Sequence, residues 1–288
     1  MQLETWTYFN GQWHKGSVPL MSSTTNAAWL GNTVFDGARY FEGVTPDIEH
    51  HCARVVDSAL KLNMMPFLTA DEIVGLVKAG CKKFSADKAL YIRPMYWIED
   101  GIGPIEPEST RFALVIQALP MPDPNTGINA CLSTYQKPHP NTAPTTAKAT
   151  CLYPHLTMAW GDAKKQGYDN AVMLDALGHV AEFTMQNLLY VKDAEVFTPK
   201  PNGMLLNGIT RQRSLGLLQQ LGYTIHEQTI EPQALLTADE IISTGNHGKI
   251  IPCVSYQNRK LPDDKVGKQL KEAYWDFAHS KTSLPLTQ

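Results

Sequence analysis

Two charged residues stand in stretches of the sequence where the surrounding pattern predicts burial. Lys148 is the only cation in the neutral stretch 142–153, and Glu182 is the only acid in the apolar run 180–185. A buried charge is costly unless it is neutralised or paired. A ligand that bonds to an amine at one end and presents a cationic nitrogen at the other would satisfy both side chains.

Pyridoxal 5'-phosphate (PLP) has these two ends. Its aldehyde forms a Schiff base with a lysine, and its pyridinium nitrogen pairs with a carboxylate. Each residue also has an ordinary structural interpretation. An isolated lysine commonly lies at the surface with its stem over apolar groups, and an isolated glutamate in a strand commonly faces solvent or pairs with an arginine. The surrounding sequence is needed to choose between these interpretations.

The composition is that of a globular protein without strong charge. The chain has 288 residues, 43% of them hydrophobic, with a net charge of -3, which gives no reason to expect nucleic acid or an anionic membrane as a partner. The five cysteines are scattered, without metal-ligand spacing, so we expect free thiols and no metal. The N-terminus does not resemble a signal peptide and no apolar run is long enough to span a membrane, so we expect a cytoplasmic enzyme.

The pattern predicts a small N-terminal α/β domain over 1–118, an interdomain linker over 119–127 and a larger C-terminal domain over 128–288. The linker has prolines at positions 120, 122 and 124, which disfavour helix and paired strand. In the N-terminal domain we expect a hairpin over 6–13, strands over 33–41, 89–97 and 111–117, and helices over 51–62 and 70–84. Thr69 and Glu72 form a capping box for the second helix.

The C-terminal domain is expected to begin with a helix over 154–166 and to continue as a β-meander over 171–198. A Leu-striped helix then ends at Gly222, and strands follow over 224–228 and 240–243. The helix starts near Asn207-Gly208-Ile209-Thr210-Arg211, where Asn207 or Thr210 is expected to cap it. Such a start can bind phosphate through its amides, although it is also an ordinary helix N-terminus. The fold class is α/β (α+β), without a Rossmann fingerprint or a P-loop.

The stretch from Lys148 to Arg211 resembles the class IV, or fold type IV, PLP-dependent aminotransferases. The signature of this family runs Glu-x-small-x-x-Asn-aliphatic-aromatic, then hydrophobic-x-Thr, then Leu-x-Gly-Ile-x-Arg. The chain matches it with Glu182 to Leu189, with Val196 to Thr198 and with Leu206 to Arg211, and departs only at Leu189, where the family has an aromatic residue. The resemblance implies two domains, the second with a barrel-like core.

The resemblance covers nearly the whole chain, and its closest form is the branched-chain amino-acid aminotransferase. The residues that carry it are Val34-Phe35-Asp36-Gly37-Ala38-Arg39, Tyr91-Ile92-Arg93-Pro94, and His51-Cys52-Ala53-Arg54 followed by Ser58. It implies a ping-pong transaminase that moves an amino group between an amino acid and a 2-oxo acid through a Lys148 Schiff base. It also implies a homodimer with active sites at the subunit interface, with residues near 101–104 reaching the site of the neighbouring subunit.

The same resemblance assigns roles to individual residues. Lys148 is the catalytic residue, and Arg54, Tyr153, Glu182, Asn187, Gly208, Ile209, Thr210 and Asn246 bind the cofactor. Within that set Arg54 reaches the phosphate, Tyr153 the ring oxygen and Glu182 the pyridine nitrogen. The residues expected to contact substrate are Phe35, Gly37, Arg39, Tyr91, Arg93 and His247. Tyr91 and Arg93 would hold an α-carboxylate, although an ion pair of Arg93 at the edge of a β-sheet is the plain alternative.

Several positions depart from the branched-chain pattern. After the lysine, Ala149-Thr150-Cys151-Leu152-Tyr153 replaces Ala-Gly-Gly-Asn-Tyr, Leu30 replaces a tyrosine, and Thr244-Gly245-Asn246-His247 replaces Ser-Gly-Thr-Ala. These changes leave cofactor binding intact and leave the substrate open. An (R)-selective amine:pyruvate or D-amino-acid transaminase is the main alternative. An aminodeoxychorismate lyase-like enzyme, or a protein that holds PLP without turnover, is a lesser one.

Overall fold

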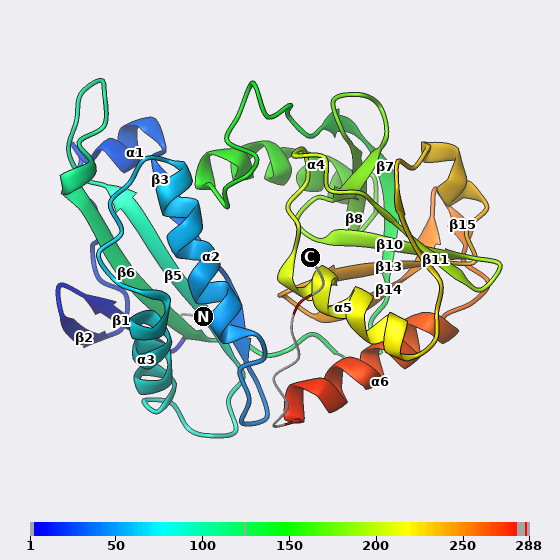
Figure 1. The fold of residues 1–288 in the computed structure, drawn as a ribbon, viewed down its shortest axis with the longest axis horizontal. Coiled ribbons are helices and arrows are strands. Elements are labelled where there is room, and N and C mark those ends of the chain that lie inside the picture. The colour runs from blue at the N-terminus through cyan, green and yellow to red at the C-terminus, as the bar shows by residue number, and fades with distance from the viewer. Residues whose placement is uncertain (1–2, 124, 281–285, 287–288) are drawn as a thin grey trace. The chain divides into compact units, whose positions relative to one another are not determined.

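A computed structural model describes residues 3–123, 125–280 and 286 (Figure 1). The chain divides into two compact units, one formed by residues 1–121 and 146–153 and the other by 122–145 and 154–288. Both units combine helices with a β-sheet, so the predicted mixed α/β class is confirmed. The segment that carries Lys148 belongs to the first unit although the chain has already entered the second before it.

The first unit is built on a six-stranded sheet with the order β2-β1-β6-β5-β3, in which β4 also pairs with β5. Its strands are β1 Thr5–Phe9, β2 Gln12–Lys15, β3 Thr33–Phe35, β4 Ala38–Tyr40, β5 Leu90–Ile98 and β6 Thr110–Ala118. Its helices are α1 Asn26–Leu30, α2 Ile48–Lys61 and α3 Ala70–Cys81, with short 3-10 turns at Pro107–Ser109 and Thr150–Leu152.

Two local predictions in this unit are confirmed. The hairpin of β1 and β2 turns at Asn10 and Gly11, whose φ angles are 50° and 78°, and positive φ at both positions is what a two-residue hairpin turn requires. The capping box at the start of α3 is present, with Thr69 accepting from the amide of Glu72 and Glu72 accepting from the amide of Thr69. This cap fixes where α3 begins.

The predicted strand over 33–41 is wrong in one respect, because it is divided into β3 and β4. Both segments pair with β5, and the interruption at Asp36 and Gly37 lies opposite Arg93 and Pro94. Asp36 donates its amide hydrogen to the carbonyl of Pro94 at 3.0 Å, but a proline has no N–H to return. The break therefore follows from the proline in the partner strand.

Helices α2 and α3 cover one face of this sheet (Figure 1). Alternate residues of β5, such as Leu90 and Ile92, are fully buried against them together with Ile73 and Val77 of α3. Burial of an aliphatic side chain of this size stabilises the fold by about 1.5–3 kcal/mol. Because side chains alternate along a strand, Tyr91 and Arg93 are placed on the opposite face.

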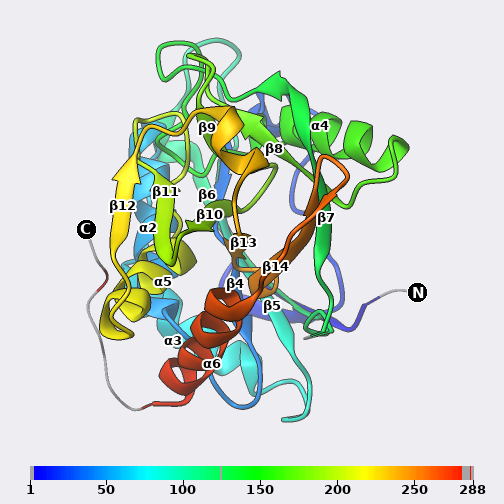
Figure 2. The ribbon, with the colours of Figure 1, turned by 90° about the vertical axis from the view of Figure 1, so that its right-hand side faces the viewer.

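The second unit contains a nine-stranded sheet with the order β12-β11-β10-β13-β14-β7-β8-β9, in which β15 also pairs with β14. Its strands are β7 Ile128–Gln136, β8 Asn170–Leu174, β9 Val180–Phe183, β10 Asn187–Lys192, β11 Glu195–Pro199, β12 Ile225–Gln228, β13 Glu240–Gly245, β14 Lys249–Tyr256 and β15 Arg259–Lys260. The helices are α4 Tyr153–Lys165, α5 Ile209–Gln220 and α6 Lys265–His279, with a 3-10 turn at Pro232–Leu236. Figure 2 shows α6 lying along β14, which it contacts.

The predicted β-meander over 171–198 is only partly correct. Strands β8 and β9 form one antiparallel pair and β10 and β11 another, but β9 ends the sheet while β10 lies between β11 and β13. Strand β9 nevertheless contacts β10 and β11, so the sheet curls toward a half-barrel. Strand β7 is parallel to both β8 and β14 and lies between them. A strand from outside the predicted meander is thus part of the same sheet.

The start of α5 also differs from the prediction. Gly208 is its N-cap residue and no side chain caps the helix, so the expected cap from Asn207 or Thr210 is wrong. The side-chain oxygen of Asn207 instead accepts from Nη1 of Arg211 at 3.0 Å, and Thr210 lies inside the helix. The first amides of α5 are therefore not used by a side-chain cap.

All five cysteines are free thiols, as the sequence predicted. Within residues 3–123 and 125–280, no helix is both long and apolar enough to cross a membrane.

Candidate active site

The backbone of Lys148 is held in the first unit by two hydrogen bonds, one at its amide and one at its carbonyl. Its amide donates to Oγ of Ser58 on α2 at 3.1 Å, and its carbonyl accepts from the amide of Phe35 at 3.1 Å. Its Nζ donates to the hydroxyl of Tyr153 at 2.7 Å and lies 5.0 Å from the centre of the Phe35 ring. The predicted pair of Lys148 and Tyr153 is thus in contact, with a half-buried amine held against a phenol.

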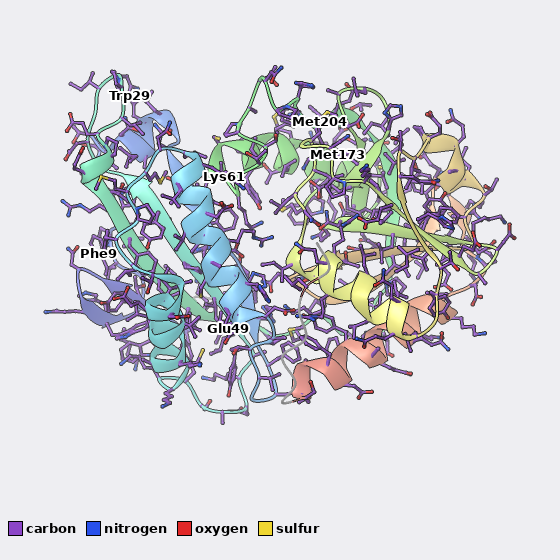
Figure 3. All side chains as sticks on the ribbon, in the orientation of Figure 1. Phe9, Trp29, Glu49, Lys61, Met173 and Met204 are labelled. Atoms are coloured by element: carbon purple, nitrogen blue, oxygen red, sulfur yellow. The ribbon has the colours of Figure 1, made fainter. Side chains whose placement is uncertain are left out.

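A second hydrogen bond ties the same segment to α2. Lys61, at the end of α2, donates from Nζ to the carbonyl of Thr146 at 3.2 Å, and Figure 3 shows it at that end of the helix, with Glu49 near the other end. Together with Ser58, it anchors residues 146–148 along one helix. The backbone position of Lys148 is therefore set by α2 and β3.

Arg54, the predicted phosphate ligand, belongs to a buried charge network on α2. The carboxylate of Asp36, which is fully buried, accepts from Nε of Arg54 at 2.6 Å, from Nη2 of Arg54 at 2.9 Å and from Nδ1 of His51 at 2.7 Å. Burial opposes ionisation of Asp36, but Arg54 and His51 outweigh it and lower its pKa well below the ordinary range. The remaining nitrogen of Arg54, Nη1, is buried and has no hydrogen-bond partner.

The unpartnered Nη1 shows where Arg54 can bind a ligand. Asp36 holds two of the three guanidinium nitrogens in a fixed fork, so the third points in one direction. A buried donor without an acceptor is costly. A phosphate oxygen would satisfy it.

Most of the predicted substrate residues share one face of the first sheet. Tyr91 and Arg93 alternate with the buried core residues of β5, Arg39 is directly opposite Tyr91, and Phe35 is opposite Met95. Burial raises the pKa of the Tyr91 hydroxyl, while the nearby cations Lys148 and Arg93 act in the opposite direction. The face opposite the helices therefore carries cationic and phenolic groups close to Lys148.

The polar groups of Arg39 and Gly37 are bonded to neighbouring protein groups. Arg39 is buried and donates to the carbonyl of Leu119 at 2.7 Å and to the sulfur of Met121 at 3.1 Å, while its Nη1 is buried without a partner. Burial lowers the pKa of Arg39 to about 10, and Tyr91 acts against this. Gly37 is buried and donates its amide hydrogen to Asp36. Both residues are fixed mainly by neighbouring groups of the first unit.

In the second unit Glu182 lies on β9 and is buried, as its sequence context predicted. It has a protein partner that the sequence reasoning missed, because Lys137 places Nζ 2.5 Å from Oε1. Asn187 donates from Nδ2 to Oε2 at 3.0 Å and also to the carbonyl of Leu206 at 2.8 Å. One cation and one amide therefore hold the carboxylate in a fixed orientation.

Gly208 is required by the close approach of Asn187. A Cβ at position 208 would lie 2.1 Å from Oδ1 of Asn187, so the Asn187 side chain, which is hydrogen-bonded to Glu182 and Leu206, would have to shift. Ile209 and Thr210, the first residues of α5, are buried, and their amides point along the start of the helix. The N-terminus of a helix attracts anions through these amides and its dipole.

The loop between β13 and β14 carries the last two predicted residues. Asn246 accepts from Nζ of Lys249 at 2.9 Å, and its Nδ2 is buried without a hydrogen-bond partner, as is Oγ1 of Thr244. His247 is exposed in this loop. The strand pairing places Thr244 opposite Asn187. The loop after β13 therefore begins beside the residue that approaches Gly208.

Sequence reasoning missed three residues that hold the predicted ones. Asp36 and His51 orient Arg54, and Lys137 pairs with Glu182. Asp36 could be recognised as an acid in a predicted strand. Its partners His51 and Arg54 lie on α2, and the sequence does not show that they contact it. Across the described ranges, no cluster of three or more His, Cys, Asp or Glu side chains has an arrangement suited to a metal ion.

Each unit, taken by itself, carries groups whose chemistry fits a part of PLP. The first unit supplies an amine beside a phenol and a buried guanidinium nitrogen without a partner. The second unit supplies a buried carboxylate, a helix start at Gly208 and buried donors without acceptors. The amine suits the aldehyde of PLP, and the carboxylate suits a protonated ring nitrogen. The guanidinium nitrogen and the helix start each suit a phosphate.

The comparisons with known proteins place the chain in a family. The model of the amino-transferase class IV family matches residues 33–256. The chain therefore belongs to this family, and it is a PLP-dependent aminotransferase.

Individual relatives show the same relationship. The chain is 30% identical to a probable branched-chain-amino-acid aminotransferase of Rickettsia conorii, over 87% of this chain and 88% of the relative. The structure is similar to that of an aminotransferase from Brucella abortus bound to PLP, with a TM-score of 0.94 and 44% identity, covering 96% of this chain and 100% of that one. It is also similar to the Escherichia coli branched-chain amino acid aminotransferase, with a TM-score of 0.88 and 26% identity, covering 98% and 97%.

Proposed function

We propose that this aminotransferase moves an amino group between a branched-chain-like L-amino acid and a 2-oxo acid. The observation that carries the chemistry is the contact of 2.7 Å between Nζ of Lys148 and the hydroxyl of Tyr153. The substrate class is supported by the relatives, among which the Rickettsia conorii and Salmonella typhimurium proteins are described as branched-chain enzymes or probable ones. The reaction has two halves, in which a donor gives up its amino group and an acceptor then receives it.

PLP, when bound, supplies an aldehyde carbon and an electron-withdrawing ring. Arg54 would bind its phosphate through the unpartnered Nη1, and the amides of Ile209 and Thr210 would bind it at the start of α5. Glu182 would accept a hydrogen bond from the ring nitrogen, with its carboxylate held in place by Lys137 and Asn187. Tyr153 would donate a hydrogen bond to the ring oxygen.

Lys148 would act as the base of the reaction. Its Nζ would take the proton from Cα of the amino donor and hold it for return. The hydrogen bonds to Ser58 and Phe35 hold the backbone of Lys148 in place. Tyr153 would orient the amine through its hydrogen bond with Nζ.

Tyr91 and Arg93 would bind the α-carboxylate of donor and acceptor alike. Both lie on the face of β5 that is turned away from the helices, and Arg93 offers a bidentate donor. Phe35 and Arg39, which pair with β5 on the same face, would border the side-chain end. His247, on the loop after β13, would line the pocket in the second unit.

We propose further that the protein acts as a homodimer with its active site at the subunit interface, and that it works in the cytoplasm. The resemblance to the branched-chain enzymes supports both expectations. Light scattering of the purified protein would measure the mass against 32.0 kDa for one chain.

The experiment that tests the proposed function is an absorbance titration of the purified protein reconstituted with PLP. The Lys148–cofactor bond gives a band in the near ultraviolet or violet, which an accepted amino donor bleaches. L-Leucine is added first, and an (R)-arylalkyl amine is added to a separate sample. Addition of 2-oxoglutarate, or of pyruvate in the amine sample, should restore the band if the second half-reaction runs.

Each result assigns the substrate differently. Bleaching by L-leucine and recovery with 2-oxoglutarate would support the branched-chain-like assignment. Bleaching by the (R)-amine alone would move the assignment to an amine transaminase. Product release without any oxo acid would indicate a lyase. Absence of a band after addition of PLP would contradict the cofactor assignment to Lys148.

A further inference from the structure

A buried lysine closes the loop between β13 and β14. Lys249 pairs with Gly245, so that residues 246–248 form a three-residue turn, and it is 1% exposed. Its φ of 62° lies in the left-handed region, which a side chain other than glycine adopts only when its surroundings hold it there. Nζ donates to Oδ1 of Asn246 at 2.9 Å and lies 5.9 Å from the centre of the Tyr274 ring on α6.

Lys249 determines which way the amide of Asn246 points. An ammonium group has donors only, so the Asn246 atom that faces it must be the oxygen. The amide nitrogen Nδ2 is therefore directed away from Lys249. It is buried and has no hydrogen-bond partner, which means that a donor is held in place without an acceptor.

The neighbouring groups show what kind of acceptor fits there. Oγ1 of Thr244 is also buried without a partner, and Thr244 is fully buried. Thr244 pairs with Asn187, whose Oδ1 lies against Gly208 at the start of α5. Helix α5 also contacts β13 (Figure 1). Two donors without acceptors thus lie at the end of the sheet where a helix begins, an arrangement that suits an anion.

We propose that Lys249 is a positioning residue for recognition of the cofactor phosphate: it fixes the amide of Asn246 so that Nδ2 donates to a phosphate oxygen. The proposal rests on the proposed function and adds to it a residue that makes the enzyme prefer phosphorylated PLP over unphosphorylated pyridoxal. The charge of Lys249 is used to orient the amide. Without it, the amide oxygen can turn toward the phosphate and oppose binding.

The test measures binding of PLP and of pyridoxal to the apoenzyme by quenching of tryptophan fluorescence. Lys249→Met should weaken PLP about tenfold, the loss expected for one hydrogen bond to a charged group, and should change pyridoxal binding less than about twofold. Lys271→Met is the matched control, because Nζ of Lys271 also lies 5.9 Å from an aromatic ring centre on α6, that of Trp275. It should leave both ligands unchanged.

A double variant separates positioning from a direct charge effect. If Lys249 acts through Asn246, then Lys249→Met combined with Asn246→Ala should bind PLP no more weakly than Asn246→Ala alone. Losses that multiply to about a hundredfold would overturn the positioning role, since the lysine charge would then act on the phosphate by itself. Equal weakening of PLP and pyridoxal would overturn it as well.

A further variant keeps the proposal testable if Lys249→Met does not fold. Asn246→Asp keeps a partner for Lys249 but replaces the donor Nδ2 by an oxygen, so PLP should bind at least about tenfold more weakly. Unchanged PLP affinity in this variant would overturn the proposal. If the wild-type protein binds PLP and no variant changes the affinity, this inference alone is contradicted. If the wild-type protein does not bind PLP, the proposed function is contradicted too.

Discussion

Removal of Lys137 should destabilise the protein far more than removal of a surface lysine. Its Nζ lies 2.5 Å from Glu182, and the two side chains are 9% and 7% exposed. Loss of one partner from a buried ion pair costs about 3–5 kcal/mol, because the other charge stays buried. Asn187 remains as a single amide donor to Glu182 and replaces only a small part of that stabilisation.

The destabilisation caused by removal of Lys137 can be measured by thermal unfolding of the apoenzyme. At about 2–4 °C for each kcal/mol in a protein of this size class, Lys137→Met should lower the unfolding midpoint by roughly 10 °C. The matched control is Lys164→Met, which breaks the pair with Asp169 at 2.9 Å, where both side chains are about half exposed. Exposed pairs contribute about 0–1 kcal/mol, so the control should melt within about 4 °C of the wild type.

A double variant tests the reason for the effect. Lys137→Met with Glu182→Gln removes both charges and leaves a neutral amide beside Asn187, so it should recover at least half of the lost midpoint. A double variant that is no more stable than Lys137→Met would show that lost packing, and not an uncompensated carboxylate, causes the change. A single variant that melts like the control would refute the buried pair itself.

Three further predictions concern the cofactor site. Lys148→Ala should abolish transamination and the absorbance band of the bound cofactor, because no other group supplies the amine at that point. Gly208→Ala should weaken PLP at least about tenfold, because its Cβ would be placed 2.1 Å from Oδ1 of Asn187. Asp36→Asn should lower the free energy of unfolding at neutral pH by about 3 kcal/mol or more and weaken PLP through Arg54. The lowered pKa of Asp36 sets the pH dependence: its stabilisation is present above pH 3.8, the ordinary value, and is lost as the pH falls toward the folded-state value.

Each of these has a measurement that can contradict it. Steady-state rates settle the first, with Lys164→Ala as the control, and full turnover by the Lys148 variant would exclude the mechanism. Fluorescence titration with PLP settles the second, and wild-type affinity in Gly208→Ala would mean that Asn187 moves aside freely. Denaturant unfolding at several pH values settles the third. A difference between Asp36→Asn and wild type that grows in acid would have the wrong sign.

The local elements were largely predictable because their signals lie within a few residues. The Asn10-Gly11 hairpin and the capping box of Thr69 and Glu72 depend on turn geometry and on contacts three residues apart. The cap of α5 was wrong for a tertiary reason, because Arg211, held by the carbonyl of Pro199 and by Glu227, also takes the side chain of Asn207. The sequence alone does not show which groups of the folded protein compete for the side chain of a predicted cap residue.

The sequence by itself determined the class of enzyme and the burial of its unusual acid. Glu182 stands in an apolar run and Lys148 in a neutral stretch, so their unusual placement could be read from the residues, whereas the role of Tyr153 came from the family resemblance. Only the tertiary structure decided which charges meet. Lys137 reaches Glu182 because β7 inserts beside β8, and Asp36 reaches Arg54 because α2 packs on β3. Pairings of this kind depend on strand order and register over tens of residues, and no local pattern of residues encodes them.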